Sequence, residues 1–508
     1  MTYYLDPFGC VKNQVDAENM MAFLNGSGWT AARNAEDADL IIVNTCAFIE
    51  SAKQESINAV LSWRTLHPGK KILLAGCLAR RYAKELKEEL GEADGFFGAE
   101  NLAEIVNAAS VVMSMPAPRA DSPQTEDPRA DNMFAAGRHT DNPHAAGPWA
   151  AGGRPLLSPP GSAYVKISEG CDNRCSFCAI PLIRGALKSR PIGEITEECK
   201  TLLSRGIREL CLVAQDSGSY GKDLITPDAG WAGAAHPKTA HHAAPPDTAN
   251  HAALPEAALL NSAHQAALDG FSQLPLLLEA LSQLKGNFRV RLLYIHPDHF
   301  PLPILDLMET DKRFIPYFDI PFQHGSEKIL KAMNRRGNAG IYLDLIKTIR
   351  QRLPDSVIRS TFLTGFPGET EEDFMQLLAF QKEACLDWLG CFTYSREEGT
   401  AAYNMKGRVA KKTAVKRKAV IEELQIPITE RQMDRFVGRN FDVLVEEEIS
   451  PGEGAGNEEE AIYLGRLPCQ APEVDGASVI FSRTPLELGA MLPCRIIARA
   501  GFDLEVKV

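Results

Sequence analysis

The chain lacks the long apolar runs of a membrane protein. Its 508 residues contain no stretch of roughly eighteen or more apolar residues, so no membrane-spanning helix is expected. Residues 1–6 (MTYYLD) have neither the basic nor the apolar region of a secretory signal. Hydrophobic residues make up 45% of the chain and charged residues 24%, which predicts an ordinary globular protein of about three domains.

An excess of positive charge is also missing. The net charge of −12 argues against a broad nucleic-acid surface, because such a surface attracts phosphates with lysine and arginine. Twelve cysteines in a long chain without a secretory signal favour metal ligands over a disulfide framework. The expected compartment is therefore a reducing cytoplasm.

The most informative feature that is present is a loop with three cysteines, Cys171, Cys175 and Cys178, spaced Cys-x3-Cys-x2-Cys. Thiolates this close together can all reach one iron–sulfur cluster, for which four cysteines are the usual complement. Three ligands predict a 4Fe–4S cluster with one iron open to a small molecule, and S-adenosylmethionine suits that position. The alternatives are structural thiols or zinc, although zinc prefers four ligands in paired Cys-x2-4-Cys knuckles.

The first 115 residues alternate short apolar runs with helical patterns, which predicts a parallel α/β domain over 1–115. Three candidate strands are each followed by a cysteine, namely Cys10 after 3–5, Cys46 after 40–43 and Cys77 after 72–75. The carboxyl ends of parallel strands share one sheet edge, so these cysteines are expected to converge on a second cluster. Three buried apolar thiols are the alternative.

A βα barrel is predicted over 157–431, behind a linker at 116–156. The linker is expected because nine prolines, with many Ala, Gly and Asp, occupy residues 116–160. Six apolar strands then alternate with helical patterns, at 163–168, 209–214, 289–295, 316–321, 357–364 and 389–394. The cysteine loop follows the first of these strands, which places it at the carboxyl-terminal mouth where barrel chemistry occurs.

A low-complexity insertion interrupts the barrel near 224–270. Residues 229–268 contain fifteen alanines and five histidines, with almost no charge. Irregular histidine spacing predicts a surface insertion. The alternative is metal binding by His236, His241, His242, His251 and His264.

The C-terminal region, 432–508, is expected to form a small β-barrel after a helical stretch at 406–437. Its short strands are separated by Gly and Pro, at 441–445, 461–464, 478–481, 495–499 and 504–508. Residues 441–508 carry thirteen Asp or Glu but only five Lys or Arg. Such a module is expected to repel tRNA and to attract a basic protein.

Four residues at the predicted mouth are candidate ligands of the cofactor. Phe177 is expected either to wall the adenine or to anchor the cysteine loop. Gln215 and its neighbour Asp216 end the second strand, where they could hydrogen-bond an amino-acid moiety or simply form a turn. Arg359 is a candidate partner for a carboxylate, or half of a structural ion pair. Gly365 allows a ligand to approach the backbone beside a helix N-terminus.

Together these motifs resemble the radical S-adenosylmethionine methylthiotransferases. The matching segments are 9–13 (GCVKN), 43–46 (VNTC), 75–77 (AGC), the Cys171 loop, 365–370 (GFPGET) and, in the family's TRAM domain, 471–476 (APEVDG). The resemblance implies an α/β protein with an N-terminal parallel α/β domain, a central partial (β/α)6 radical SAM barrel and a C-terminal TRAM-like β-barrel. It also implies S-adenosylmethionine and two 4Fe–4S clusters, the second held by Cys10, Cys46 and Cys77 and presenting a methylated sulfur.

Within that family, the chain is similar to the branch that modifies a ribosomal protein. The matching segments are 212–216 (LVAQD), 294–297 (YIHP), 321–324 (PFQH), 359–362 (RSTF) and 392–395 (FTYS). This resemblance implies methylthiolation of an aspartate β-carbon in the twelfth small-subunit ribosomal protein, with an electron donor as a further partner. The alternatives are a tRNA-adenosine methylthiotransferase and a non-enzymatic iron–sulfur or zinc-binding interaction protein.

Overall fold

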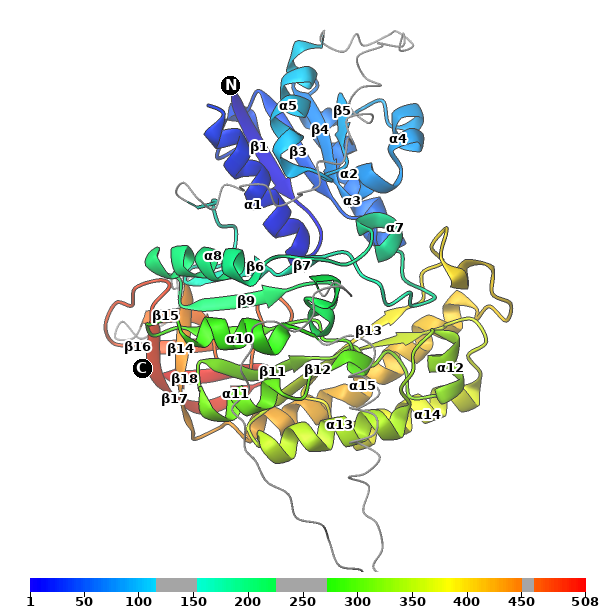
Figure 1. The fold of residues 1–508 in the computed structure, drawn as a ribbon, viewed down its shortest axis with the longest axis vertical. Coiled ribbons are helices and arrows are strands. Elements are labelled where there is room, and N and C mark those ends of the chain that lie inside the picture. The colour runs from blue at the N-terminus through cyan, green and yellow to red at the C-terminus, as the bar shows by residue number, and fades with distance from the viewer. Residues whose placement is uncertain (116–152, 225–271, 450–460) are drawn as a thin grey trace, which may run out of the picture.

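The computed structural model describes residues 1–115, 153–224, 272–449 and 461–508. Figure 1 shows an N-terminal α/β unit above an open six-stranded sheet, with a closed β-barrel packed beside that sheet. The five histidines of the predicted insertion and residues 116–152 of the predicted linker lie outside the described residues. None of the helices in the described ranges combines the length and apolar character that a membrane crossing requires.

The N-terminal unit is a parallel sheet in the order β2-β1-β3-β4-β5, as predicted for a parallel α/β domain. Its strands are β1 (Thr2–Pro7), β2 (Thr30–Ala31), β3 (Leu40–Thr45), β4 (Lys71–Gly76) and β5 (Gly95–Phe97). One face packs on α1 (Val11–Gly26) and α5 (Ile105–Ser114), and the other on α2 (Glu50–Leu66), α3 (Cys77–Arg81) and α4 (Ala83–Glu89). Burial on both faces explains why β3 and β4 are almost continuously apolar.

The central sheet consists of six parallel strands in sequence order, the open (β/α)6 arrangement that was predicted. Its strands are β6 (Ser162–Lys166), β9 (Glu209–Val213), β10 (Arg289–Leu292), β11 (Phe314–Asp319), β12 (Val357–Thr364) and β13 (Trp388–Thr393). The helices on its outer face are α8 (Ile192–Ser204), α10 (Leu274–Ser282), α11 (Ile304–Thr310), α13 (Ala339–Arg352) and α14 (Glu371–Ala384). Three further helices are α7 (Ile180–Arg184), α12 (Glu327–Ala332) and α15 (Lys411–Asp434), and β7 (Ser168–Glu169) pairs with β8 (Lys188–Ser189).

The C-terminal unit is a closed five-stranded barrel, which confirms the predicted small β-barrel. Its strands are β14 (Asn440–Ile449), β15 (Ala461–Arg466), β16 (Ser478–Ser482), β17 (Met491–Ala500) and β18 (Asp503–Lys507). It packs on the face of the central sheet that the helices leave uncovered, where Val213 and Tyr317 meet Leu467 and Cys469. The inside of the open sheet is therefore filled by the C-terminal barrel.

The junction between the N-terminal unit and the central sheet is a buried ion cluster around Arg154. This side chain is 1% exposed, and its Nε donates to Glu18 of α1 at 2.6 Å. The same guanidinium contacts Glu198 of α8 and the carbonyl of Tyr164 in β6. Residues 153–156 were predicted to belong to the linker, but packing begins before 157 because Arg154 neutralises two buried carboxylates.

Candidate functional site

The three cysteines of the Cys171 loop, here named the loop triad, lie at the carboxyl ends of β6 and β7. The turn into the loop requires Gly170, whose φ is +72° and whose Cβ, if present, would overlap the Ala186 carbonyl. The backbone N–H of Cys171 donates to Gly185 at 3.1 Å. The first half of the loop is thus fixed against the segment that follows α7.

The second half of the loop is anchored on α12. The N–H of Ser176 donates to the Met333 carbonyl at 3.1 Å, and its hydroxyl donates to the Ala332 carbonyl at 2.8 Å. Phe177 is half-buried against an apolar cluster that contains Met333 and Phe366. This packing is the anchoring role considered from the sequence, and the contact of Phe177 with adenine stays a prediction.

Burial controls the ionisation of the loop triad. It raises the pKa of Cys171 and Cys178 to about 12, and it also raises the pKa of Cys175. The three thiols lie close enough to act on one another electrostatically. Thiolates at these positions therefore need a positively charged metal centre as their partner.

The donor set of the loop triad is three thiols on one loop. A structural zinc ion is usually held by four ligands in paired knuckles, whereas the cysteines of a 4Fe–4S cluster bind separate irons. Three thiols therefore fit a cluster that has one open iron better than they fit zinc.

A second set of thiols, here named the strand triad, consists of Cys10, Cys46 and Cys77. They follow β1, β3 and β4, and the helices after β1 and β3 pass to opposite faces of the sheet. Such a switch in winding opens a crevice where doubly wound sheets bind ligands. The structure brings the three thiols within electrostatic reach of one another at this crevice.

Two asparagines hold the loops of the strand triad. The Asn13 amide donates to the Thr45 carbonyl at 2.8 Å, and the Asn44 amide donates to the Asn13 carbonyl at 2.9 Å. Gly76 has a φ of +95°, and a Cβ there would lie 2.5 Å from the Asn44 side-chain oxygen. The segment that follows Cys10 is thus held against the segment that precedes Cys46, and Gly76 lets the segment before Cys77 approach both.

Arg184 of α7 joins the two triads. Its Nη2 lies 3.2 Å from the Cys77 sulfur, and its Nη1 lies 2.8 Å from Asp16 and 2.9 Å from Glu169. Burial opposes ionisation of the Cys10 thiol, but the charges of Lys12 and Arg184 outweigh it and lower the pKa. The sequence analysis missed Arg184, and its only sequence signal is its closeness to the Cys171 loop.

The neighbouring strand-end residues Gln215 and Asp216 differ in their hydrogen-bond partners. The Gln215 amide donates to Glu169 at 3.3 Å, while its buried side-chain oxygen has no partner among the described residues. Asp216 is buried and accepts hydrogen bonds from Asn173 at 2.9 Å and Ser219 at 2.6 Å. Asp216 therefore braces the turn, which is the alternative considered from the sequence, while Gln215 offers an unused acceptor, and a ligand contact of either residue stays a prediction.

Arg359 and Gly365 have structural partners that the sequence did not reveal. Arg359 pairs with Asp319 at 3.3 Å and with Asp475 of the C-terminal barrel at 3.5 Å, which is the ion-pair alternative. Gly365 has a φ of +77°, and a Cβ there would lie 2.5 Å from Ala414 on α15. Helix packing explains this glycine, and both cofactor roles stay predictions.

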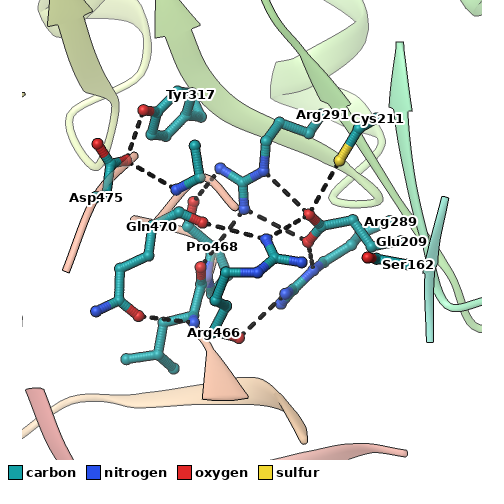
Figure 2. Close-up of polar contacts among 12 residues, drawn as sticks. Ser162, Glu209, Cys211, Arg289, Arg291, Tyr317, Arg466, Pro468, Gln470 and Asp475 are labelled. Carbon is teal, nitrogen blue, oxygen red and sulfur yellow. Dashed lines mark hydrogen bonds and ion pairs between the residues drawn. The ribbon is translucent and has the colours of Figure 1, made fainter. Parts of the chain in front are cut away.

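Beneath the mouth, a buried ion network fixes the C-terminal barrel to the central sheet (Figure 2). Glu209 is fully buried and pairs with Arg289, with Arg291 at 3.2 Å and with Arg466 at 2.7 Å. Burial opposes ionisation of this carboxyl, but the three guanidinium groups hold its pKa well below its usual range. Since Arg466 comes from β15 and the other two from β10, the network joins two units.

Comparisons with known proteins cover all three units. Residues 2–98 match the uncharacterized protein family UPF0004, residues 165–380 the Radical SAM superfamily, and residues 437–508 the TRAM domain. A solved structure that is similar to the chain is the radical S-adenosylmethionine methyltransferase TsrM from Kitasatospora setae. It has a TM-score of 0.46 and 14% identity, over 79% of this chain and 76% of that one.

Two curated relatives match nearly the whole chain. The ribosomal protein uS12 methylthiotransferase RimO of Treponema denticola is 45% identical over 519 residues, covering 99% of this chain and 99% of that protein. RimO of Thermotoga maritima is 35% identical over 498 residues, covering 98% of this chain and 97% of that protein. The Radical SAM superfamily uses an iron–sulfur cluster and S-adenosylmethionine. The chain therefore belongs to the RimO family of radical S-adenosylmethionine methylthiotransferases, with a TRAM domain at its C-terminal end.

Proposed function

We propose that this enzyme replaces a β-hydrogen of an aspartate in ribosomal protein uS12 with a methylthio group. The observation that carries the proposal is the position of Arg184, which follows the loop triad in the chain and contacts Cys77 of the strand triad. Arg184 also pairs with Glu169, two residues before Cys171, so the segment that carries the loop triad packs against the strand triad. One substrate side chain that reaches both triads is part of the proposal.

The loop triad Cys171, Cys175 and Cys178 is assigned to the cluster that binds S-adenosylmethionine. When bound, this pair supplies a 5′-deoxyadenosyl radical, which can remove hydrogen from a carbon that is too inert for general-base chemistry. The unpartnered oxygen of Gln215 is assigned to the ammonium group of the methionine moiety. Phe177 and Gly365 are assigned to the wall of the same site, and Arg359 to the carboxylate.

The strand triad Cys10, Cys46 and Cys77 is assigned to a second 4Fe–4S cluster, which would supply the methylated sulfur. The chain prepares this site in two ways. Asn13 and Asn44 fix the loops that carry the thiols. Lys12 and Arg184 favour the Cys10 thiolate, the form that binds iron.

Charge supports a protein substrate over tRNA. The thirteen Asp or Glu and five Lys or Arg of residues 441–508 oppose the phosphate contacts on which nucleic-acid affinity depends. A groove of about 700 Å³ between residues 157–160 and the C-terminal barrel is lined by Glu447 and Glu473, and by Glu446, which pairs with Arg466 of the same lining. A ribosomal protein that binds RNA is basic and complements this surface. The other partner is a cytoplasmic electron donor.

The proposal is tested with anaerobically reconstituted enzyme, S-adenosylmethionine, a reductant and purified uS12. We expect release of 5′-deoxyadenosine and the addition of one methylthio group to an aspartate, measured by mass spectrometry. Methylthiolation of tRNA instead of uS12 would assign the chain to the tRNA-adenosine branch. No release of 5′-deoxyadenosine with any substrate would favour a non-enzymatic iron–sulfur protein.

A further inference from the structure

Lys12 is a buried lysine without an acidic partner. Its side chain lies at the first turn of α1 and only 8% of the residue is exposed. Its ammonium nitrogen sits 3.3 Å from the centre of the Tyr294 ring, and the described residues supply it with no hydrogen bond or ion pair. The cation–π contact with the Tyr294 ring stabilises the ammonium where water is excluded. The ring replaces only part of the hydration that a buried ammonium loses, so an anion is expected beside it. The Cys10 thiolate is one anion within reach, and a substrate anion is a second candidate.

The carboxylates around Lys12 already form ion pairs with other cations. The carboxylates whose charge reaches its ammonium are those of Asp319 and Glu169. Asp319 pairs with Arg359 at 3.3 Å. Glu169 pairs with Lys166 at 2.6 Å and with Arg184 at 2.9 Å. Among the described residues, Lys12 therefore has no carboxylate of its own.

Its position fits the reacting part of an aspartate substrate. Lys12 is two residues from Cys10 of the strand triad, and Tyr294 lies two residues beyond β10, at the carboxyl ends of the central strands. In aspartate, the carboxylate is one bond from the β-carbon that reacts. A group that binds the carboxylate must therefore lie close to the reacting carbon. Lys12 lies near Cys10 of the strand triad and extends from the N-terminal unit onto Tyr294 of the central sheet.

We propose that Lys12 binds the side-chain carboxylate of the target aspartate, with Tyr294 holding the ammonium in place. This assignment rests on the proposed function and specifies how the site selects its substrate residue. Asparagine has the same shape as aspartate but no charge, so it leaves the Lys12 ammonium unpaired and binds more weakly. A different role, support of the Cys10 thiolate alone, would not distinguish aspartate from asparagine.

The test is a double-mutant cycle on the reconstituted holoenzyme. The probes are two labelled peptides from uS12, one with the target aspartate and one with asparagine at that position, and their dissociation constants are measured anaerobically. We expect wild-type enzyme to bind the aspartate peptide about tenfold more tightly, which corresponds to about 1.4 kcal/mol. Lys12→Met should bind both peptides equally, because the two changes remove the same interaction. Lys12→Arg should restore a preference for aspartate.

Two controls keep the outcome interpretable. Lys53→Met removes another lysine of the N-terminal unit, one that already pairs with Glu397 at 3.3 Å, and should leave the tenfold preference unchanged. Iron content equal to wild type shows that Lys12→Met is folded and loaded. A preference that survives in Lys12→Met overturns the assignment. The assignment is also overturned if wild-type enzyme methylthiolates the aspartate peptide but binds both peptides with equal affinity. That result would leave the proposed function unchanged. Failure of wild-type enzyme to modify uS12 overturns the proposed function itself.

Discussion

The mouth of the central sheet and its lower interior differ in whether their buried charged groups have ion-pair partners. At the mouth, the Lys12 ammonium has the Tyr294 ring but no hydrogen bond or ion pair among the described residues, and the Gln215 side-chain oxygen has no partner among them. Beneath it, Glu209 is surrounded by three guanidinium groups, and Arg291 also lies over the Tyr317 ring at 4.7 Å (Figure 2). Both regions are buried, so exposure does not account for the difference.

The pairing of charges, more than single unpartnered atoms, indicates which region binds ligands, because Arg466 in the lower interior also has a nitrogen without a hydrogen-bond partner among the described residues. An unpaired buried polar group costs stability, so a fold retains one where something else completes it. A buried carboxylate with several cations is costly to break but has little left to offer a ligand. We therefore expect changes at the mouth to alter chemistry, and changes in the lower interior to alter stability.

The largest expected effect is on chemistry, from the cysteines at the mouth. Cys178→Ala should reduce 5′-deoxyadenosine release by at least about 10⁴-fold, because the S-adenosylmethionine cluster loses a ligand. Replacing Cys10, Cys46 and Cys77 together by alanine should retain this release but abolish methylthio transfer. Iron analysis measures the loss of cluster, chromatography of the nucleoside measures the release of 5′-deoxyadenosine, and mass spectrometry of uS12 measures methylthio transfer.

A matched control for these cysteines is Cys199→Ala, which removes a buried thiol in α8 on the outer face of the sheet. It should leave the iron content unchanged. About eight irons per chain in the variant without the strand triad would refute the second cluster.

The next largest effect is on stability, from the lower interior. Glu209→Gln leaves three buried guanidinium groups without their shared carboxylate and should lower the unfolding free energy by about 3–5 kcal/mol. Denaturant unfolding measures the change. Glu197→Gln is the control, because its side chain is 71% exposed and pairs only with Lys200 on the surface, and it should change stability by less than about 0.5 kcal/mol. Equal stability of the two variants would show that the network does not hold the units together.

The smallest effect is a pH dependence from Asp475. Burial raises the pKa of this carboxyl to about 6, although Arg359 and the Tyr317 hydroxyl oppose the shift. Between its unfolded and folded pKa values, the folded chain keeps a proton that the unfolded chain has lost. Its contribution to stability therefore falls as pH rises and is constant above about pH 7.

The measurement is the difference in unfolding free energy between wild type and Asp475→Asn. From pH 5 to pH 7 this difference should fall by about 1 kcal/mol, because a unit of pKa shift corresponds to about 1.4 kcal/mol. Asp355 pairs with Arg439, which lowers its pKa, so both states of the chain are ionised over this range. Asp355→Asn should accordingly show no pH-dependent difference, and a slope for Asp475→Asn of the opposite sign would contradict the prediction.

Much of the architecture and the positions of both triads could be predicted from local patterns. The Cys171 loop can be recognised from the spacing of its cysteines alone. The strand β12 has the predicted bounds 357–364 because its apolar run ends sharply. The strand triad needed only the rule that parallel strands end on one sheet edge. In each case the information lies within a few residues of the feature.

The remaining features depend on contacts between distant residues. Arg184 meets Cys77 across 107 positions, and Gly365 meets Ala414 on a helix that no local pattern connects to it. One signal was present in β10, where Arg289 and Arg291 alternate with apolar residues. Alternation with a period of two indicates one polar face, and that face carries the lower ion network.

The ion pairs of Arg154 hold the N-terminal unit against the central sheet, and they do not depend on the length of the segment that connects the two units. The guanidinium binds one carboxylate from each unit immediately after residues 116–152. For a flexible connection, each doubling of length costs only about 0.6 kcal/mol in closure entropy. Relatives can therefore gain or lose segments between these units during evolution while the two triads keep their positions relative to one another.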